Sequence, residues 1–231
     1  MARTAPTGLL IVRASDALTL LDWKRRVFAL YEDVRSAADP AEAWSLWRAV
    51  RDDLFANHPQ SPLPPERREA FDGLSFYDYD PAARALAEVS EAEPRTYEIA
   101  TSGEGAYSFT RVGVAAFELG GEACELELYW LEGYGGGIFL PFADATSGGQ
   151  TYGAGRYLFD TVKGADLGTD DGRLVLDFNF AYNPSCCYDP RWVCPLAPQP
   201  NRLAVPVEAG EQALPRTTRK RSDDLAPPGA I

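Results

Sequence analysis

The chain has 231 residues, of which 45% are hydrophobic and 24% charged, a composition typical of a globular protein with a full core. Its formal net charge of −12 repels phosphate backbones, so we expect no nucleic-acid partner. No apolar run approaches the ~20 residues that cross a bilayer, and no secretory leader is recognisable, so we expect no membrane partner and a cytoplasmic location.

The first half of the chain predicts a helical hairpin over residues 15–57, preceded by a flexible arm at 1–14. Apolar residues recur at three- and four-residue steps from Leu20 to Val34, which is the spacing of a helix with one buried face. Asp39 and Pro40 then provide a cap and a first-turn proline for a second helix. Prolines remove backbone donors from the segment 58–72, so we expect it to wrap around the outside of the domain.

The second half of the chain predicts β-structure. From about residue 95 the apolar pattern has a period of two, with turn signals about every ten residues. Strands are predicted at 74–79, 97–100, 107–114, 124–130, 138–142, 156–162, 173–182 and 203–208. No helix of crossover length separates them, which favours antiparallel pairing. The predicted fold is mainly β, an antiparallel β-barrel or β-sandwich of about eight strands with an N-terminal helical hairpin (α+β).

These elements predict one domain over residues 15–212, with the β-part at 73–212. The residues at 213–231 are polar and proline-rich, so we expect a disordered tail.

Polar residues inside two predicted strands indicate a site. Asp177 and Asn179 fall on one face of the segment 173–182, which suggests a partly enclosed polar cavity. Arg156 lies in an apolar strand, where an unpaired cation is costly, so we expect it to pair with Asp177 or to bind an anionic ligand. A structural role stays open for all three, because short polar side chains often bond to local backbone and buried Arg often serves ion-pair networks.

The turn-rich loop at 144–152 is predicted to form the rim of the same pocket, although its side chains also suit local backbone bonding. The ligand-binding candidates on this rim and after the strand are Asp144, Thr146, Thr151, Tyr152, Tyr182 and Asn183. His58, the only histidine, is a candidate general base or a cap of a backbone group.

The four cysteines are Cys124, Cys186, Cys187 and Cys194. They lack the spacing of a zinc site, and the sequence predicts neither a metal nor a cofactor. A disulfide from Cys186 or Cys187 to Cys194 is sterically open, but free thiols are expected in a reducing cytosol. No histidine is identifiable near them to activate a nucleophilic thiol.

Many of these residues, in the same order, resemble a bacterial family catalogued as domain of unknown function 1684. The matching positions span most of the chain and include Trp23, 51–54, 58–63, 79–81, 142–148, 151–158, 176–179, 181–184, Cys186, Tyr188, 194–196, Asn201 and 209–211. The family implies no established activity. The resemblance does imply that His58 and Glu211 belong to the same functional unit as the strand residues.

The favoured functional hypothesis is a protein that binds a small anionic or polar molecule, either as a simple binder or as a cofactor-independent enzyme. In it, Arg156 holds the anionic group, Asp177 or Glu211 acts as acid or base, and His58 is a further catalytic candidate. One alternative is a non-catalytic module whose polar residues form a buried hydrogen-bond network. Another is a metal-dependent hydrolase using Asp144, Asp177 and Glu211. Whether the chain is an enzyme, and its oligomeric state, stay open.

Overall fold

The computed structural model describes residues 13–133 and 135–214. The chain begins with two long helices, α1 (Ala14–Ser36) and α2 (Pro40–Asn57), followed by the short α3 (Pro65–Arg68). The predicted helical hairpin is therefore confirmed. Asp39 caps α2, because its Oδ1 accepts the backbone N–H of Ala41 at 2.8 Å. The arm predicted at 1–14 and the tail predicted at 213–231 lie almost entirely outside the described residues.

Seven strands form one antiparallel sheet with the order β5-β4-β3-β2-β1-β7-β6. Their bounds are β1 (Arg84–Ala100), β2 (Ala106–Leu119), β3 (Glu122–Leu131), β4 (Ile138–Phe142), β5 (Arg156–Asp160), β6 (Thr169–Asp170) and β7 (Arg173–Asp177). The two long hairpins β1–β2 and β2–β3 are in continuous register except for one shift in each pair.

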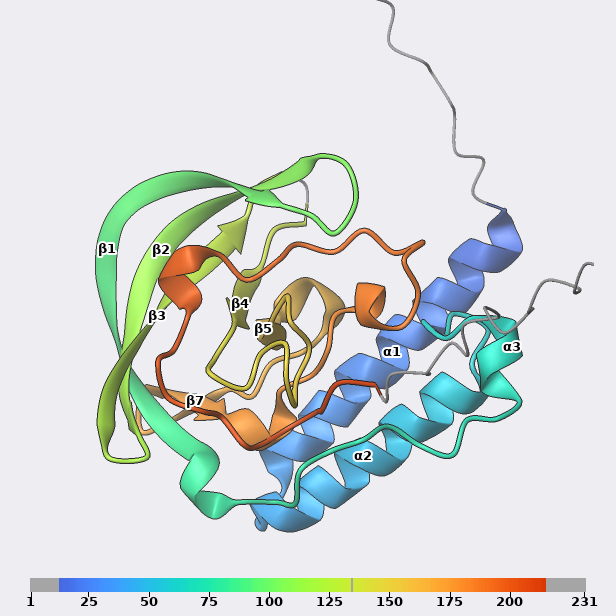
Figure 1. The fold of residues 1–231 in the computed structure, drawn as a ribbon, viewed down its shortest axis with the longest axis horizontal. Coiled ribbons are helices and arrows are strands. Elements are labelled where there is room, and N and C mark those ends of the chain that lie inside the picture. The colour runs from blue at the N-terminus through green and yellow to red at the C-terminus, as the bar shows by residue number, and fades with distance from the viewer. Residues whose placement is uncertain (1–12, 134, 215–231) are drawn as a thin grey trace, which may run out of the picture.

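The predicted barrel or sandwich is wrong, because the edge strands β5 and β6 do not pair and there is only one sheet among the described residues. The physical reason is that α1 and α2 cover the apolar side that a second sheet or a closure would otherwise bury. In Figure 1, β1, β2 and β3 form a curved layer on one side and the two helices run along the other. Trp44 and Trp47 of α2 belong to the same buried cluster as Leu126 and Leu176 of the sheet. No helix of the described residues is long and apolar enough to cross a membrane.

Several predicted strands differ in the structure, and the one predicted at 156–162 ends at Asp160. The strand at 173–182 ends at Asp177, because residues Phe178–Phe180 turn into a 3-10 helix. The segments 74–79 and 203–208 are irregular, and the first makes only an isolated bridge from Phe76 to Glu211. Conversely, β1 starts at Arg84 rather than near residue 97. The middle of β1, around Pro94, is exposed and has a shift in register. Apolar and polar residues therefore do not alternate there, and the sequence does not predict this part of the strand.

Candidate functional site

Arg156 lies at the start of β5 and is fully buried. Its Nη2 donates to Asp144 Oδ2 at 2.9 Å and to the carbonyl of Val207 at 3.0 Å. Its Nη1 donates to the carbonyls of Ala209 at 2.5 Å and Glu211 at 3.3 Å. The expected ion pair with Asp177 is therefore wrong, and the partner is Asp144. Burial lowers the pKa of Arg156, which the nearby Asp144 opposes. The guanidinium thus hydrogen-bonds to three alternate backbone carbonyls within residues 203–214, which we call the C-terminal segment.

The loop after β4 supplies the counter-charge. Asp144 Oδ1 accepts the N–H and the hydroxyl of Thr146 at 2.7 and 2.6 Å, and the N–H of Val207 at 3.2 Å. The hydroxyls of Thr146 and Thr151 are 2.8 Å apart. These three predicted ligand-binding residues thus lie together beside Arg156, and their polar atoms bond to one another and to the backbone. Their role in ligand binding stays a prediction.

Glu211 forms a second buried group that joins the C-terminal segment to α2. Its Oε2 accepts from Arg51 at 2.9 Å and from the N–H of Asn183 at 3.0 Å, and Tyr188 donates to its Oε1. Burial raises the pKa of this carboxyl, which Arg51 opposes. The Arg51 guanidinium also lies over the ring of Tyr182, 5.1 Å from its centroid. The Glu211 carbonyl bonds to Arg156, so the two groups are continuous.

Asp177 and Asn179 lie in a third, separate group. Asp177 Oδ1 caps the 3-10 helix by accepting the N–H of Asn179 at 3.0 Å and its side-chain amide at 2.9 Å. The amide of Asn179 also bonds to the N–H and the carbonyl of Asp80, at 2.9 and 2.7 Å. Burial raises the pKa of Asp177 to about 6. These contacts match the structural alternative, in which short polar side chains satisfy local backbone.

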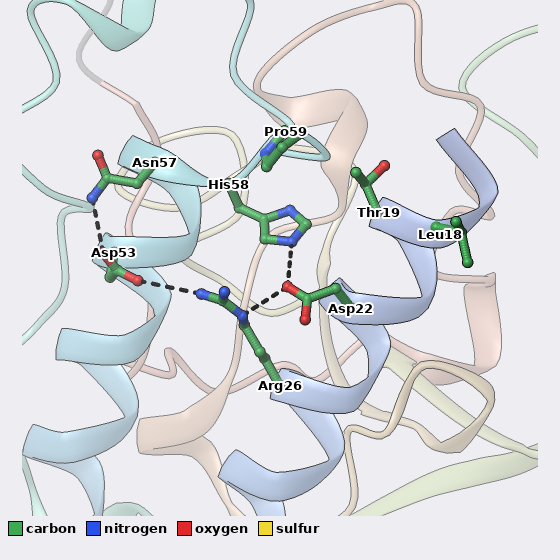
Figure 2. Close-up of a pocket in the computed structure, with 8 residues that line it drawn as sticks. All are labelled: Leu18, Thr19, Asp22, Arg26, Asp53, Asn57, His58 and Pro59. Atoms are coloured by element: carbon green, nitrogen blue, oxygen red, sulfur yellow. Dashed lines mark hydrogen bonds and ion pairs between the residues drawn. The ribbon is translucent and has the colours of Figure 1, made fainter. Parts of the chain in front are cut away.

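His58 lies elsewhere, in an open hollow of about 440 Å³ between α1 and α2. Figure 2 shows its ring pointing at Asp22, with Nε2 and Oδ2 3.1 Å apart, and Asp22 in turn bound by Arg26. His58 Nδ1 accepts the N–H of Gln60 at 3.0 Å. A backbone N–H can only donate, so Nδ1 is the acceptor and Nε2 carries the proton. Both ring nitrogens of His58 are therefore engaged in holding the start of the proline-rich segment.

The residues named for the metal alternative do not converge. Asp144, Asp177 and Glu211 belong to the three different groups described above. Among residues 13–133 and 135–214, no three His, Cys, Asp or Glu side chains form a cluster that would hold a metal ion.

A second hollow, of about 410 Å³, lies between α1, the strands β2 to β4 and the segment 185–195. We call it the α1 cavity. Its walls are mainly apolar and aromatic, and include Trp23, Phe109, Leu131, Phe139, Val162 and Trp192. Neither hollow is lined by Arg156, Asp177 or Glu211. The pocket expected beside Arg156 is instead occupied by the C-terminal segment.

Three charged side chains line the α1 cavity, and they are Lys24, Asp160 and Lys163. Lys163 Nζ lies 2.6 Å from Asp160 Oδ2, with 61% of the lysine side chain exposed. Lys24, half-buried on α1, has no carboxylate within 4 Å in the described part of the chain. The chain has only three lysines, Lys24, Lys163 and Lys220, and the last lies outside the described residues.

Sequence reasoning did not find this cavity. The available signal was the scarcity of lysine in a chain with 22 basic residues, because two of its three lysines line this cavity. Nothing in the sequence reveals that residues 24 and 163 line the same hollow. Tyr152, expected on the pocket rim with Thr151, instead points its hydroxyl at Cys186, 3.6 Å from the sulfur.

Comparisons with known proteins place the chain in a family without an established activity. No curated protein matches it. A solution NMR structure of an uncharacterised protein from Haloarcula marismortui is 39% identical, covering 71% of this chain and 89% of that one, with a TM-score of 0.53. A family model described as "Protein of unknown function (DUF1684)" matches residues 69–212. The chain therefore belongs to the DUF1684 family, as its motifs suggested.

Proposed function

We propose that this protein binds a small apolar molecule that carries an anionic group, and that it does so in the α1 cavity. The observation that carries the proposal is that both lysines of the described chain line one apolar hollow. Ligand sites are typically concave and mainly apolar, with a few polar groups that fix orientation.

The charges favour an anion over a neutral or cationic ligand. Lys24 and Lys163 against Asp160 give the lining one excess positive charge, in a chain whose net charge is −12. Asp160 holds the Lys163 ammonium in place, whereas Lys24 has no acidic partner within 4 Å among the described residues. A carboxylate between the two ammonium groups would restore neutrality, while Trp23 and Phe139 would contact the apolar body at ~25 cal/mol per Å² of buried surface.

The motif residues around Arg156 are assigned a different task. Four N–H groups of Arg156 already bond to protein acceptors, which leaves little capacity for a ligand. We infer that the groups centred on Arg156 and Glu211 form the buried network of the non-catalytic alternative, which fastens the C-terminal segment to the sheet and to α2. Neither nucleic acid nor a membrane is part of this proposal, and a cytoplasmic location stays a prediction.

The test uses decanoate as the anionic probe and decyltrimethylammonium as its cationic counterpart. Trp23 and Trp192 line the cavity, so intrinsic fluorescence reports binding. We expect decanoate to bind and the cation to bind at least tenfold more weakly. The excess positive charge of the lining attracts the anion and repels the cation by ~1 kcal/mol each, and a difference of ~1.4 kcal/mol is tenfold. Lys24→Gln should weaken decanoate binding about fivefold at low salt.

The matched control is Arg25→Gln. Arg25 is the exposed neighbour of Lys24 on the same helix, it does not line the cavity, and its replacement removes the same charge. Affinity should be unchanged in this variant. Equal affinities for the two probes, or an equal loss in both variants, would show that the cavity has no preference for anions.

A further inference from the structure

His58 is a buried titratable side chain that lies outside the α1 cavity and contacts two residues of its wall. Its Nδ1 accepts the backbone N–H of Gln60 at 3.0 Å. Its ring also makes a T-shaped contact with Trp23, with ring centroids 5.2 Å apart. Gln60 and Trp23 both line the α1 cavity, whereas His58 lines only the other hollow. The imidazole is therefore placed to change the cavity wall without contacting a ligand.

Gln60 is held to α1 by its side chain and to His58 by its backbone. Its side-chain amide donates to Thr19 Oγ1 at 2.8 Å and to the Asp16 carbonyl at 3.3 Å. Its backbone N–H lies in a turn that the Ser61 N–H closes by donating to the His58 carbonyl at 3.0 Å. The bond to His58 Nδ1 therefore fixes the corner of the turn from which Gln60 enters the cavity wall.

The charged groups around the His58 ring keep it attached to α1. Nε2 lies 3.1 Å from Asp22 Oδ2, and Arg26 of the same helix binds this carboxylate at 2.9 Å (Figure 2). From α2, Asp53 lies 3.9 Å from the Arg26 guanidinium. From α3, Arg68 donates to the His58 carbonyl rather than to the ring, at 3.2 Å. Asp22 accepts from the Nε2–H group whether the ring is neutral or charged, so this contact persists in both states.

Proton uptake by His58 breaks the bond to Gln60. Nε2 already carries a proton, so the added proton goes to Nδ1. The Nδ1–H group would then face the N–H of Gln60, and two donors cannot share a hydrogen bond. The ion pair with Asp22 holds the charged ring on α1, so the backbone of Gln60 is the part that moves away. A neutral His58 thus favours the closed wall, and a protonated His58 favours a loosened one.

We propose that His58 is a pH-sensitive switch that loosens the wall of the α1 cavity when it takes up a proton, and so weakens anion binding at acidic pH. The inference rests on the proposed function, because anion binding is the output of the switch. A ligand that prefers the closed wall must in turn oppose proton uptake by His58, since the coupling is reciprocal. A coupling at the lower end of the usual range changes affinity about fivefold.

The test measures decanesulfonate binding to the full chain between about pH 5.5 and 8 by intrinsic fluorescence. The sulfonate stays ionised over this range, so only the protein titrates. His58 is the only histidine, so its ring gives a single NMR titration curve in the same samples. The Kd should rise about fivefold as the pH falls, following that curve, and saturating decanesulfonate should move the curve to lower pH.

His58→Asn is the matched variant. The Asn oxygen can accept the N–H two residues further on, in the place of Nδ1, but the side chain cannot take up a proton. The Kd of this variant should be independent of pH. Asp177→Asn removes a carboxyl whose pKa burial raises to about 6. This second variant should keep the wild-type pH dependence, because Asp177 lines neither hollow.

Hydrogen exchange of the Gln60 amide tests the switch without a ligand. The protection of this amide, corrected for the intrinsic rate, should fall as His58 takes up a proton. Unchanged protection through the His58 titration, a Kd that rises equally in His58→Asn, or tighter binding at acidic pH would overturn the proposal. Absence of decanesulfonate binding at pH 8 would reject the proposed function instead, and the Gln60 amide alone would then decide whether the switch exists.

Discussion

Replacing Asp177 by Asn should stabilise this protein relative to wild type, and the gain should be larger at pH 8 than at pH 4. Asp177 is 2% exposed, and its Oδ1 accepts two hydrogen bonds from Asn179. It has no basic side chain within 4 Å among the described residues. Asn has the same shape, keeps a carbonyl oxygen for both bonds and cannot ionise. The substitution therefore removes the cost of burying a carboxylate while the hydrogen bonds are retained.

The magnitude follows from the pKa of the buried carboxyl. Burial raises it from 3.8 to about 6, so the folded protein holds this proton more tightly than the unfolded chain. The stability that the raised pKa of Asp177 contributes is fully present below pH 3.8 and is lost as the pH rises through 6. A shift of about two units at 1.36 kcal/mol each corresponds to ~3 kcal/mol.

Urea unfolding of wild type and Asp177→Asn, followed by tryptophan fluorescence between pH 4 and 8, measures this difference. The free energy of unfolding of the variant minus that of wild type should increase by about 2.5 kcal/mol between pH 4 and 8, because a small part of the effect is already lost at pH 4. The control is Asp78→Asn, which removes an exposed carboxylate from a nearby segment and should give a flat difference. A difference for Asp177→Asn that does not change with pH would refute the reasoning, since it would mean that the carboxylate is solvated in the folded state.

Two further substitutions test the packing at and next to Arg156. Arg156→Met leaves Asp144 buried without its cation, so the free energy of unfolding in urea should fall by roughly 3–5 kcal/mol, and the double variant Arg156→Met/Asp144→Asn should recover part of it. A single variant as stable as wild type would contradict a structural network. Gly155→Ala should also destabilise strongly, because the added Cβ would lie 2.5 Å from the Phe142 carbonyl oxygen at φ +94°. Gly105, at φ +93° with nothing within 4 Å, is the matched control, and thermal unfolding should show a clearly smaller loss for its Ala variant than for Gly155→Ala.

The helices and hairpins were predictable because their signals are local. The cap of α2 needs only Asp39 and the residues directly after it. The hairpin between β2 and β3 follows from alternation on either side of two glycines, and Leu126 in the resulting β3 is fully buried as that pattern requires. Such contacts join residues close in sequence, so the sequence specifies them without knowledge of the rest of the fold.

The site was predicted less well because its contacts are distant in sequence. The alternation of polar and apolar residues continues past Asp177, so the sequence predicts a strand there. The chain instead turns into a 3-10 helix, because short polar residues such as Asp177 suit a helix cap as well as a strand. That error placed Asn179 on a strand face with Asp177, whereas the pairing of Asp177 with Arg156 was expected from the cost of an unpaired buried cation. The true partner, Asp144, was named for the pocket rim, but the sequence could not say which of two carboxylates would meet the guanidinium.

By itself, the sequence determined that this chain is an acidic protein with a helical hairpin, antiparallel strands and a polar centre that includes Arg156 and Glu211. Only the tertiary structure decided that the sheet stays open, that this polar centre is filled by the C-terminal segment, and that Lys24 and Lys163 both line one apolar cavity. The physical reason is the separation in sequence between the residues that interact. Periodicity and capping act over a few residues, whereas ion pairs and cavities depend on how whole elements pack, which no local pattern encodes.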